Sequence, residues 1–476
     1  MKGNLIGGEW VGAVNGRWCE RRNPADTSVV VSTYPDSGPE DAKQAVGGVL
    51  AGYREWSDTA PGARAEVLQR AADIMARDAE RLARELVAEE GKTLAEAKGE
   101  AGRTPANLRF YAGEALRMSG RTYPTADGSL VLTTREPVGV VLAITPWNFP
   151  LNIPSRKLGP ALAAGNGVVF KPSEVTPLMG QRLVEALLEA GLPAGAIALV
   201  QGDGGVGAAL VADDRVDAVT FTGSSAAGAA IHRAAGVRQR CQLEMGGKNP
   251  VIVLEDADLD RAAALIVRGA FGLSGQACTG TSRVIVADAV HDALAEGVAA
   301  RATALRVGDG LLDGVDMGPL ATEAQLAKVG EHLATAREEG ARSLTGRQHL
   351  DAGEGHFARP SVLVDVAPSA RVAREEVFGP VLGFLRAGSF DEAVKLANDT
   401  EYGLSASIVT ADIGRALSFA KQSESGLVKI NQPTTGMAMN APFGGMKNSS
   451  TQTFKEQAGE TMMHFYTTDK TVYVSS

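Results

Sequence analysis

Apolar residues follow two different spacings along the chain. Between Ala63 and Lys98 they recur every three or four residues among charged positions, until Gly91 interrupts the pattern. This spacing predicts amphipathic helices. From position 138 the pattern changes to short apolar runs rich in β-branched residues. These runs are Val138–Thr145, Val168–Lys171, Ile197–Gln201, Ala218–Thr222 and Pro250–Leu254. Such runs between helical stretches predict βαβ units that build a parallel, doubly wound sheet.

A second α/β region is expected after Leu254, extending to about Asn431. Its predicted strands are Ser282–Ala287, Val381–Leu385 and Ser405–Thr410. In the first region, the helical pattern of Pro177–Ala190 stops at Gly191, a common helix-ending residue. Since the 476 residues exceed the roughly 250–300 that one core supports, two or more domains are expected.

Two segments alternate apolar and polar residues apart from these regions. They are Ser129–Glu136 and the tail Met463–Val474. An isolated strand with one polar face favours an arm that pairs with another strand across a subunit interface. The pattern therefore predicts a homodimer or homotetramer.

Charge and hydropathy exclude several classes of protein. The chain has 47 Lys and Arg against 56 Asp and Glu, a net charge of −9, and no basic run. This balance argues against binding of nucleic acid or anionic membrane, which need a positive field. The start of the chain lacks the pattern of a signal peptide, and no apolar run approaches the about 18 residues of a membrane span. A cytoplasmic location is expected.

The three cysteines are Cys19, Cys241 and Cys278. They are too few and too scattered for a disulfide framework or a Cys-rich zinc site, and the histidines show no ligand-like pairing, so no metal is expected. Cys278 lies in a loop of small residues flanked by glycines, where backbone N–H groups would lower the thiol pKa and favour a nucleophile. A buried, inert thiol is an equally good interpretation of that position alone. Cys19 and Cys241 are interpreted as structural.

Glycine makes up 56 of the 476 residues, and two of its clusters resemble nucleotide-binding turns. Gly202–Gly207 matches G-x-G-x-x-G after a predicted strand, and Phe221–Gly228 has the same strand, turn and helix order. Either cluster alone is better explained as an ordinary βα turn. Together on one parallel sheet they favour a nucleotide site.

Two polar residues end predicted strands. Glu244 precedes a double-glycine turn, where it is either a cap residue or a general base in a cleft. Asn148 stands between Pro146 and Pro150, which would hold its amide rigidly as an oxyanion donor. The alternative for Asn148 is a polar turn bonded to backbone.

These motifs together resemble the NAD(P)-dependent aldehyde dehydrogenases, over nearly the whole chain. The matching motifs, in order, are Pro146-Trp-Asn148-Phe-Pro150, Lys171-Pro-Ser-Glu174, Phe221-Thr-Gly-Ser224, Leu243-Glu244-Met-Gly-Gly-Lys248, Gly275-Gln-Ala-Cys278, Glu376-Val-Phe378-Gly-Pro380 and Pro442-Phe443-Gly-Gly445. The resemblance implies an α/β fold with a Rossmann-type NAD-binding domain (1–120 and 138–247), a second α/β catalytic domain (248–447) and a β-strand oligomerisation arm (121–137 and 448–476).

The resemblance also implies roles for single residues. Cys278 is the expected nucleophile, which forms a thiohemiacetal and then a thioester. Asn148 and the Cys278 N–H would hold the oxyanion, and Glu244 would activate water for hydrolysis. Lys171 completes the expected catalytic set and also contacts the cofactor. The cofactor site is expected to include Ile144, Thr145, Pro146, Trp147, Lys171, Ser173, Glu174, Gly207, Phe221, Gly223, Ser224, Glu244, Glu376 and Phe378. The literal glycine motif at Gly202 is then partly a decoy, with Gly207 near the adenosine.

Glu174 favours NAD over NADP, because a carboxylate suits ribose hydroxyls and repels a 2′-phosphate. Lys171 is near enough to soften this preference, so NADP stays possible. Glu244 favours hydrolysis to a free acid, since CoA-acylating relatives commonly lack this glutamate.

The expected substrate-binding residues are Asn148, Arg156, Cys278 and Phe443. Arg156 would clamp a distal carboxylate on the aldehyde. The tail 440–450 with Glu456 and Gln457 is similar to 2-oxoglutarate semialdehyde (2,5-dioxopentanoate) dehydrogenases. Gly272 departs from succinic semialdehyde enzymes, which often have arginine there.

Three alternatives stay open from the sequence. Arg156 is equally well explained by a surface or interface salt bridge. The substrate would then be a neutral aliphatic or aromatic aldehyde. A catalytically silent structural protein on the same scaffold is the third alternative, against which the retention of Cys278, Glu244 and Asn148 argues.

Overall fold

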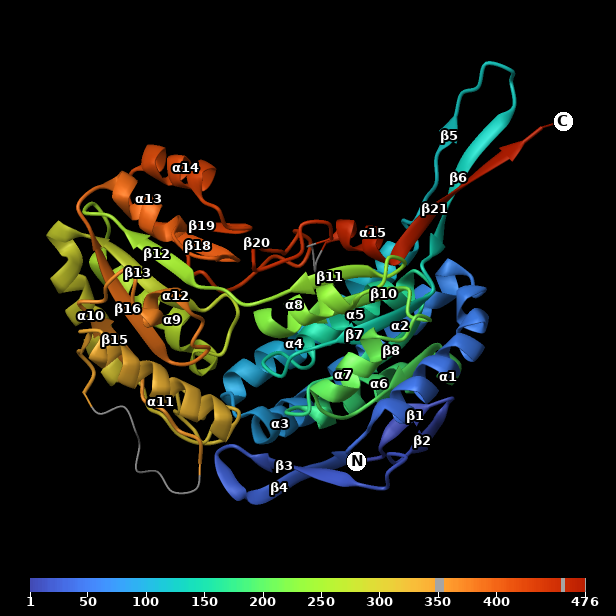
Figure 1. The fold of residues 1–476 in the computed structure, drawn as a ribbon, viewed down its shortest axis with the longest axis horizontal. Helices are drawn as coiled ribbons and strands as arrows, with labels where there is room; N and C mark the ends of the chain where they lie inside the picture. Colours follow the sequence, from blue (N-terminus) through green and yellow to red (C-terminus); the bar gives the residue numbers. More distant parts are fainter. Residues whose placement is uncertain (347–354, 455–458, 476) are drawn as a thin grey trace.

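Two seven-stranded sheets and a projecting three-stranded sheet organise the molecule (Figure 1). The computed structural model describes residues 1–346, 355–454 and 459–475, so Glu456 and Gln457 of the tail motif lie outside the described residues. A separate hairpin of β3 (Trp18–Asn23) and β4 (Asp26–Pro35) lies near the chain start. The α/β fold class predicted from the sequence is confirmed.

The first sheet has the order β11-β10-β7-β8-β9-β1-β2. Its strands are β1 (Asn4–Ile6), β2 (Glu9–Val11), β7 (Val140–Ile144), β8 (Gly167–Lys171), β9 (Ile197–Leu199), β10 (Ala218–Thr222) and β11 (Arg240–Glu244). The strands from β11 to β9 run parallel, whereas β1 pairs antiparallel with β9 and β2. Both faces are covered, since Val141 and Ala143 pack in one core and Val140 and Leu142 in the other. Burial on both faces explains the continuous apolar runs.

Eight helices and one 3-10 turn accompany this sheet. They are α1 (Pro39–Ser57), α2 (Pro61–Arg77), α3 (Ala79–Glu90), α4 (Leu94–Ala115), α5 (Asn152–Ala163), α6 (Pro177–Glu189), η1 (Ala194–Ala196), α7 (Gly204–Val211) and α8 (Ser225–Ala234). Residues of α2 to α6 share one core with the sheet, and α1 and α7 share the other. The predicted interruption at Gly91 is the left-handed C-cap of α3, with φ 105°.

The second sheet has the order β14-β15-β16-β13-β12-β18-β19. Its strands are β12 (Asn249–Val253), β13 (Thr281–Ala287), β14 (Arg342–Ser343), β15 (Ser361–Val364), β16 (Val381–Ala387), β18 (Ser405–Val409) and β19 (Leu427–Ile430). The accompanying elements are α9 (Leu259–Phe271), η2 (Gly272–Gly275), η3 (Asp288–Val290), α10 (His291–Thr303), α11 (Glu323–Glu338), α12 (Arg371–Arg374), α13 (Phe390–Asn398), α14 (Ile413–Gln422) and the pair β17 (Tyr402–Gly403) and β20 (Met446–Lys447). The run predicted at Pro250–Leu254 as a strand of the first sheet belongs here instead, because β12 pairs with β13 and β18.

The arm consists of β21-β6-β5 and projects from the first region (Figure 1). Its elements are β5 (Thr122–Tyr123), β6 (Leu130–Pro137), η4 (Glu460–Met462), α15 (Met463–Tyr466) and β21 (Thr467–Val474). The sequence predicts that the arm strand pairs with a strand of another subunit. In the structure, β6 pairs instead with β21 of the same chain, over eight residue pairs. The tail strand also begins later than predicted, because Met463–Tyr466 is a buried helical turn.

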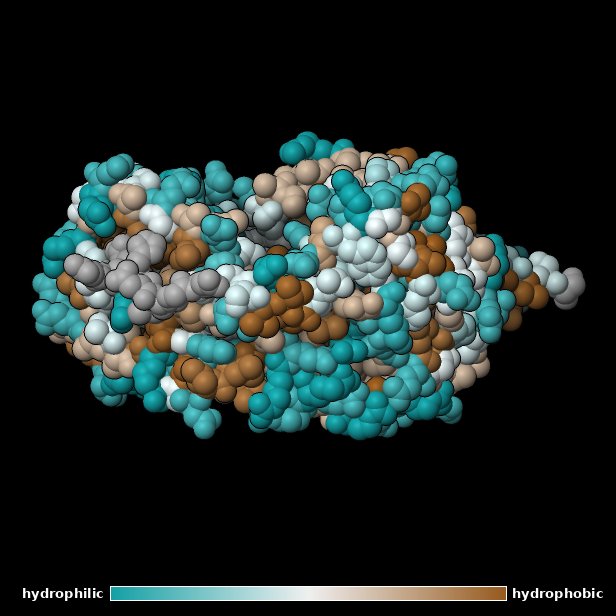
Figure 2. Space-filling model, turned by 90° about the horizontal axis from the view of Figure 1, so that it is seen from below, coloured by the Kyte–Doolittle hydropathy of each residue, from teal (hydrophilic) through white to brown (hydrophobic). Residues whose placement is uncertain are grey.

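Figure 2 shows a mostly hydrophilic face with separate hydrophobic patches, and hydrophobic residues also lie on the projecting arm. Tyr123, Leu130, Tyr473 and Val474 are the exposed large apolar residues of the arm. Among the described residues, none of the helices combines the length and apolar character needed to traverse a bilayer.

Candidate active site

The predicted site residues converge between the two large sheets. Asn148 follows β7, Ser224 follows β10 and Glu244 ends β11, all at the carboxyl edge of the first sheet. Cys278 comes from the second region, in the loop between η2 and β13. Ligands of open α/β sheets bind at this edge of the strands.

The Cys278 loop has an unusual backbone. Leu273 and Ser274 adopt left-handed conformations with φ 53° and 55°, and Gly275 follows with φ 72°. A Cβ at Gly275 would lie 2.2 Å from the Gly379 carbonyl oxygen, so only glycine fits there. After the turn, the Asn249 amide donates to the Cys278 carbonyl at 2.8 Å. The loop is therefore held on both sides of the thiol.

Two cavities meet at Cys278. The first, of about 180 Å³, is lined by Pro146, Trp147, Asn148, Thr222, Gly223, Ser224, Met245, Gly246, Cys278, Gln325, Lys328, Glu376 and Phe378. The second, of about 100 Å³, is lined by Arg103, Phe149, Asn152, Ile153, Arg156, Thr222, Glu244, Met245, Cys278, Thr279, Gly436, Met437 and Phe443. The thiol is thus reached from two directions.

The resting state of Cys278 is the protonated thiol. Burial raises its pKa to about 12, and the carboxylates of Glu376 and Glu244 act in the same direction. Backbone N–H groups of Thr279 and Cys278 lower the pKa, as predicted from the loop, but they do not outweigh burial. The predicted lowered pKa is therefore wrong, and the thiol needs a base to react at neutral pH.

The alkylation rate of Cys278 by iodoacetamide is expected to rise about tenfold per pH unit from pH 7 to 9, because the thiolate fraction grows that way well below the pKa. Mass-spectrometric counting of modified Cys278 measures the rate, with Cys278→Ser as the background control. A rate that levels off by pH 8 would contradict the raised pKa.

Asn148 and Glu244 are buried beside the thiol. The Asn148 Nδ2 donates to the Gln276 carbonyl at 2.9 Å, whereas its Oδ1 is buried without a hydrogen-bond partner. Glu244 accepts from the Ser450 hydroxyl at 2.7 Å and from the Gly445 N–H at 3.3 Å. Both polar groups are therefore oriented before any substrate enters.

Arg156 of α5 lies in the second cavity with Cys278. It is 3% exposed and forms no ion pair with a described residue, so the surface salt bridge of the alternative interpretation is wrong, whereas the interface salt bridge stays a prediction. One guanidinium nitrogen contacts the Met437 sulfur, and the Nη2 is buried with no hydrogen-bond partner. Burial lowers the arginine pKa to about 10. A buried cation with a free donor is an anion-binding group.

The remaining predicted cofactor residues lie at or after the ends of β7 and β8, in α7 and in β10. The Lys171 ammonium is 3.4 Å from the Glu174 carboxylate, and the Ser173 hydroxyl is 3.4 Å from the same carboxylate. Gly207 faces Ile144 and Lys171, since a Cβ there would lie 3.8 Å and 4.0 Å from their side chains. Thr145 and Phe221 are buried beside this group. None of these seven residues lines the two cavities at Cys278, so their place in the cofactor site stays a prediction.

The Trp147 and Phe378 rings pack edge to face at 5.4 Å, joining the two regions across the first cavity. Glu376 accepts from the Gly247 N–H at 3.1 Å, and burial raises its pKa. These contacts place the predicted residues Trp147, Glu376 and Phe378 together, although they are far apart in the sequence.

Several lining residues were not predicted. They include Gln325 and Lys328 in the first cavity and Arg103 and Met437 in the second, and Ser450, which bonds Glu244, was not predicted either. Arg103 is an exposed arginine of α4, a residue type that the charged face of any helix carries. No local sequence signal distinguishes it.

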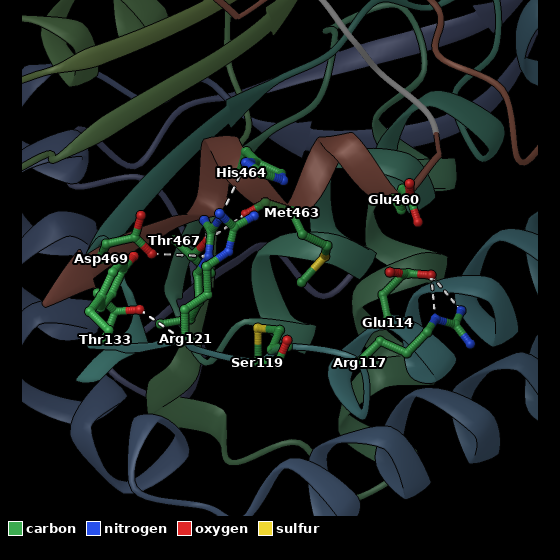
Figure 3. Close-up of a pocket in the computed structure, with 13 residues that line it drawn as sticks. Glu114, Arg117, Ser119, Arg121, Thr133, Glu460, Met463, His464, Thr467 and Asp469 are labelled. Carbon is green, nitrogen blue, oxygen red and sulfur yellow. Dashed lines mark hydrogen bonds and ion pairs between the residues drawn. The ribbon is translucent and has the colours of Figure 1, made fainter. Parts of the chain in front are cut away.

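A larger cavity, of about 710 Å³, lies apart from Cys278 at the base of the arm (Figure 3). Arg135 of β6 lines it, donating to the Thr467 hydroxyl at 2.9 Å and pairing with Asp469 at 3.2 Å. Its guanidinium also lies 3.2 Å from His464 Nδ1. These contacts tie the arm to α15, so we associate this cavity with the arm.

This fold and site define an aldehyde dehydrogenase. The aldehyde dehydrogenase family model matches residues 10–472, and the chain belongs to that family as an aldehyde-oxidising oxidoreductase. It is 44% identical to the alpha-ketoglutaric semialdehyde dehydrogenase of Bacillus subtilis (strain 168), over 99% of this chain and 97% of that protein. It is 43% identical to the 2,5-dioxopentanoate dehydrogenase of Saccharolobus solfataricus, over 95% of each chain. Among solved structures, the NAD-dependent aldehyde dehydrogenase from Sinorhizobium meliloti has a TM-score of 0.95 and 36% identity, over 99% of this chain and 94% of that chain.

Proposed function

We propose that this enzyme oxidises 2-oxoglutarate semialdehyde, or a similar aldehyde with a distal carboxylate, to the acid with NAD. The observation that carries the proposal is the buried Arg156, whose free Nη2 shares a cavity with the Cys278 thiol. The names of the two relatives, an alpha-ketoglutaric semialdehyde dehydrogenase and a 2,5-dioxopentanoate dehydrogenase, support the same substrate class.

In the first step, the Cys278 sulfur attacks the aldehyde carbon and forms a thiohemiacetal. Because the thiol pKa is about 12, a base must take its proton, and Glu244 lines the same cavity. The developing oxyanion accepts from the Asn148 amide and the Cys278 N–H. The Asn148 amide is already fixed by its bond to Gln276, so little reorganisation is needed.

The residues of the first cavity fit a dinucleotide. Gly223 and the N-cap Ser224 line this cavity at the start of α8, where the N–H groups of a helix's first turn suit a pyrophosphate. The Glu174 side chain is 43% exposed, which leaves its carboxylate available to ribose hydroxyls and favours NAD over NADP. When bound, the nicotinamide supplies the hydride acceptor that converts the thiohemiacetal to a thioester. We assign this binding to residues 1–120 and 138–247, and the thiol to a catalytic domain at 248–447.

In the last step, Glu244 takes a proton from water, which attacks the thioester and releases the acid. Ser450 and Gly445 each donate to one of its carboxylate oxygens. These bonds hold the carboxylate in the cavity that it shares with Cys278.

Two cations suit the distal carboxylate. Arg156 lies buried in the cavity, and Arg103 lines the same cavity from an exposed position. The aromatic and aliphatic lining residues Phe149, Ile153 and Phe443 would contact the carbon chain between the two ends. The apolar lining is also the observation that favours a neutral aldehyde, which is the second candidate.

Arg156→Met is expected to lower kcat/KM for 2-oxoglutarate semialdehyde by about 10- to 100-fold, because a buried charged hydrogen bond contributes about 1.5–3 kcal/mol. The kcat/KM for pentanal should change less than about threefold. Arg103→Met should have a smaller effect, since its charge is screened by solvent. Initial rates, measured with NAD and with NADP, give kcat/KM for the parent enzyme and for the two variants.

The matched control is Arg109→Met, which removes an arginine of α4 from an exposed ion pair with Asp73. An equal response of both aldehydes to Arg156→Met would reject the carboxylate clamp and favour the neutral substrate.

We further propose that the enzyme is a homo-oligomer joined by the arm. The arm projects with exposed Tyr473 and Val474, and β21 is an edge strand of its sheet. The strand β19 is an unpaired edge of the second sheet, beside the exposed Ile413 and Leu417 of α14. Unpaired edges with apolar neighbours are sites of strand addition between chains.

Deleting residues 467–476 is expected to convert the oligomer into a species near the monomer mass of 49.4 kDa. Sedimentation velocity measures the mass of both proteins. Circular dichroism checks that the shortened chain is folded. If the full chain already sediments as a monomer, the proposal of a homo-oligomer is wrong.

A further inference from the structure

The first two turns of α4 contact both backbone segments that carry the proposed oxyanion donors. Glu96 and Glu100 are four residues apart, so their carboxylates lie on one face of the helix. One reaches the segment after Asn148 and the other reaches the turn before Cys278. Neither residue contacts the thiol cavities as a lining residue.

Glu100 and Lys92 hold the Asn148 segment at two points. The Glu100 Oε1 accepts from the N–H groups of Leu151 and Asn152 at 2.9 and 3.0 Å. Its Oε2 accepts from the Lys92 ammonium at 2.6 Å. That ammonium also donates to the Asn148 carbonyl at 2.7 Å. All of these bonds are buried, so each is protected from competing water.

Glu96 holds the other segment. Its Oε1 accepts from the Leu273 N–H at 2.6 Å, in the left-handed turn five residues before Cys278. Its Oε2 accepts from the Thr93 N–H and hydroxyl, both at 2.9 Å, which fixes the carboxylate in the capping box of α4. A leucine in the left-handed region is strained, so it persists only where the surrounding structure holds it.

We propose that Lys92, Glu96 and Glu100 are positioning residues, which set the separation between the Asn148 amide and the Cys278 N–H. Glu96 and Glu100 belong to α4, and Lys92 lies just before the N-cap Thr93 and donates to Glu100, so a displacement of the start of this helix would move both segments. Misplacement of a catalytic donor by about 1 Å costs on the order of a hundredfold in rate. We call Lys92, Glu96 and Glu100 the clamp. Because the clamp acts through Asn148, this inference rests on the proposed oxyanion role of that residue.

Two reactions of the same thiol separate positioning from a general structural effect. Attack of Cys278 on p-nitrophenyl acetate needs no cofactor and passes through an oxyanion, with p-nitrophenolate as the leaving group. Alkylation by iodoacetamide displaces iodide from a saturated carbon and forms no oxyanion. A distorted oxyanion hole slows only the first reaction, whereas a disordered site alters both.

Glu96→Gln and Lys92→Met are each expected to slow acylation by p-nitrophenyl acetate about tenfold, with alkylation changed less than twofold. The matched control is Lys98→Met, which removes the exposed ion pair between Lys98 of α4 and Glu80 of α3 and should alter neither rate. Glu96 is only partly buried, so we expect Glu96→Gln to fold. If Lys92→Met does not fold, the two rates of Glu96→Gln test the positioning role.

The variants are then combined with Asn148→Ala. If the clamp acts through the Asn148 amide, Glu96→Gln slows acylation less than twofold in that background. The proposal is overturned if Glu96→Gln, and Lys92→Met where it folds, leave the acylation rate unchanged. It is also overturned if these variants slow acylation and alkylation equally. If Asn148→Ala alone leaves acylation unchanged, the oxyanion role itself fails, which is a distinct result.

Discussion

Replacing Cys278 with serine is expected to lower kcat/KM for aldehyde oxidation by at least about a thousandfold. A serine hydroxyl is a weaker nucleophile than a thiolate. No group next to position 278 would compensate, because burial and the nearby Glu244 and Glu376 already disfavour an anion there. The absorbance of reduced nicotinamide, followed with excess aldehyde and NAD, measures the loss.

The controls for this experiment are the other two cysteines. Cys19 lies in β3 and Cys241 in β11, and neither lines a cavity at the site. Cys19→Ser and Cys241→Ser should keep kcat/KM within about threefold of the parent enzyme. Retained activity in Cys278→Ser would reject covalent catalysis by this residue, and with it the mechanism proposed above.

Glu244→Gln is expected to complete one turnover and then stall, with steady-state kcat lower by about 100- to 1000-fold. The amide cannot take a proton from the hydrolytic water, although its oxygen can still accept from Ser450. Stopped-flow absorbance should show a burst of reduced cofactor close to one per active site, followed by a slow phase.

The burst itself separates the two possible duties of Glu244. A burst at nearly the parent rate assigns Glu244 to hydrolysis alone. A burst slowed by more than about tenfold shows that it also takes the thiol proton, consistent with the raised thiol pKa. Undiminished steady-state turnover would require a different base for hydrolysis.

Most of the fold could be predicted from hydrophobic spacing, because strands covered on both faces become short apolar runs. For this reason the predicted strands match observed ones, as Val138–Thr145 does with β7 and Ala218–Thr222 with β10. The same property produced the error at Pro250–Leu254. A run that is apolar on both faces does not specify which sheet it joins, and only the pairing of β12 with β13 decides it.

At the site, the residues with a distinctive local setting could be predicted, and the others could not. Cys278, Asn148 and Glu244 stand in rigid turns of glycine or proline, which mark them in the sequence. Arg103 and Ser450 stand in ordinary polar surroundings, and their places depend on long-range packing. The prediction of a lowered thiol pKa was wrong for a related reason. The loop sequence indicates the backbone N–H groups near the thiol, but it does not indicate the burial that outweighs them.

The two cavities at the thiol have a consequence for altering the enzyme. Of their lining residues they share three, which are Thr222, Met245 and Cys278. Arg156 lines only the second cavity and Glu376 only the first, and the two share no hydrogen-bond partner among the described residues. We therefore expect the effects of substitutions at these two positions on the free energy of activation to add. If the two cavities bind the dinucleotide and the aldehyde as proposed, we expect the selectivity for each to change independently, because the cavities share little beyond the Cys278 sulfur.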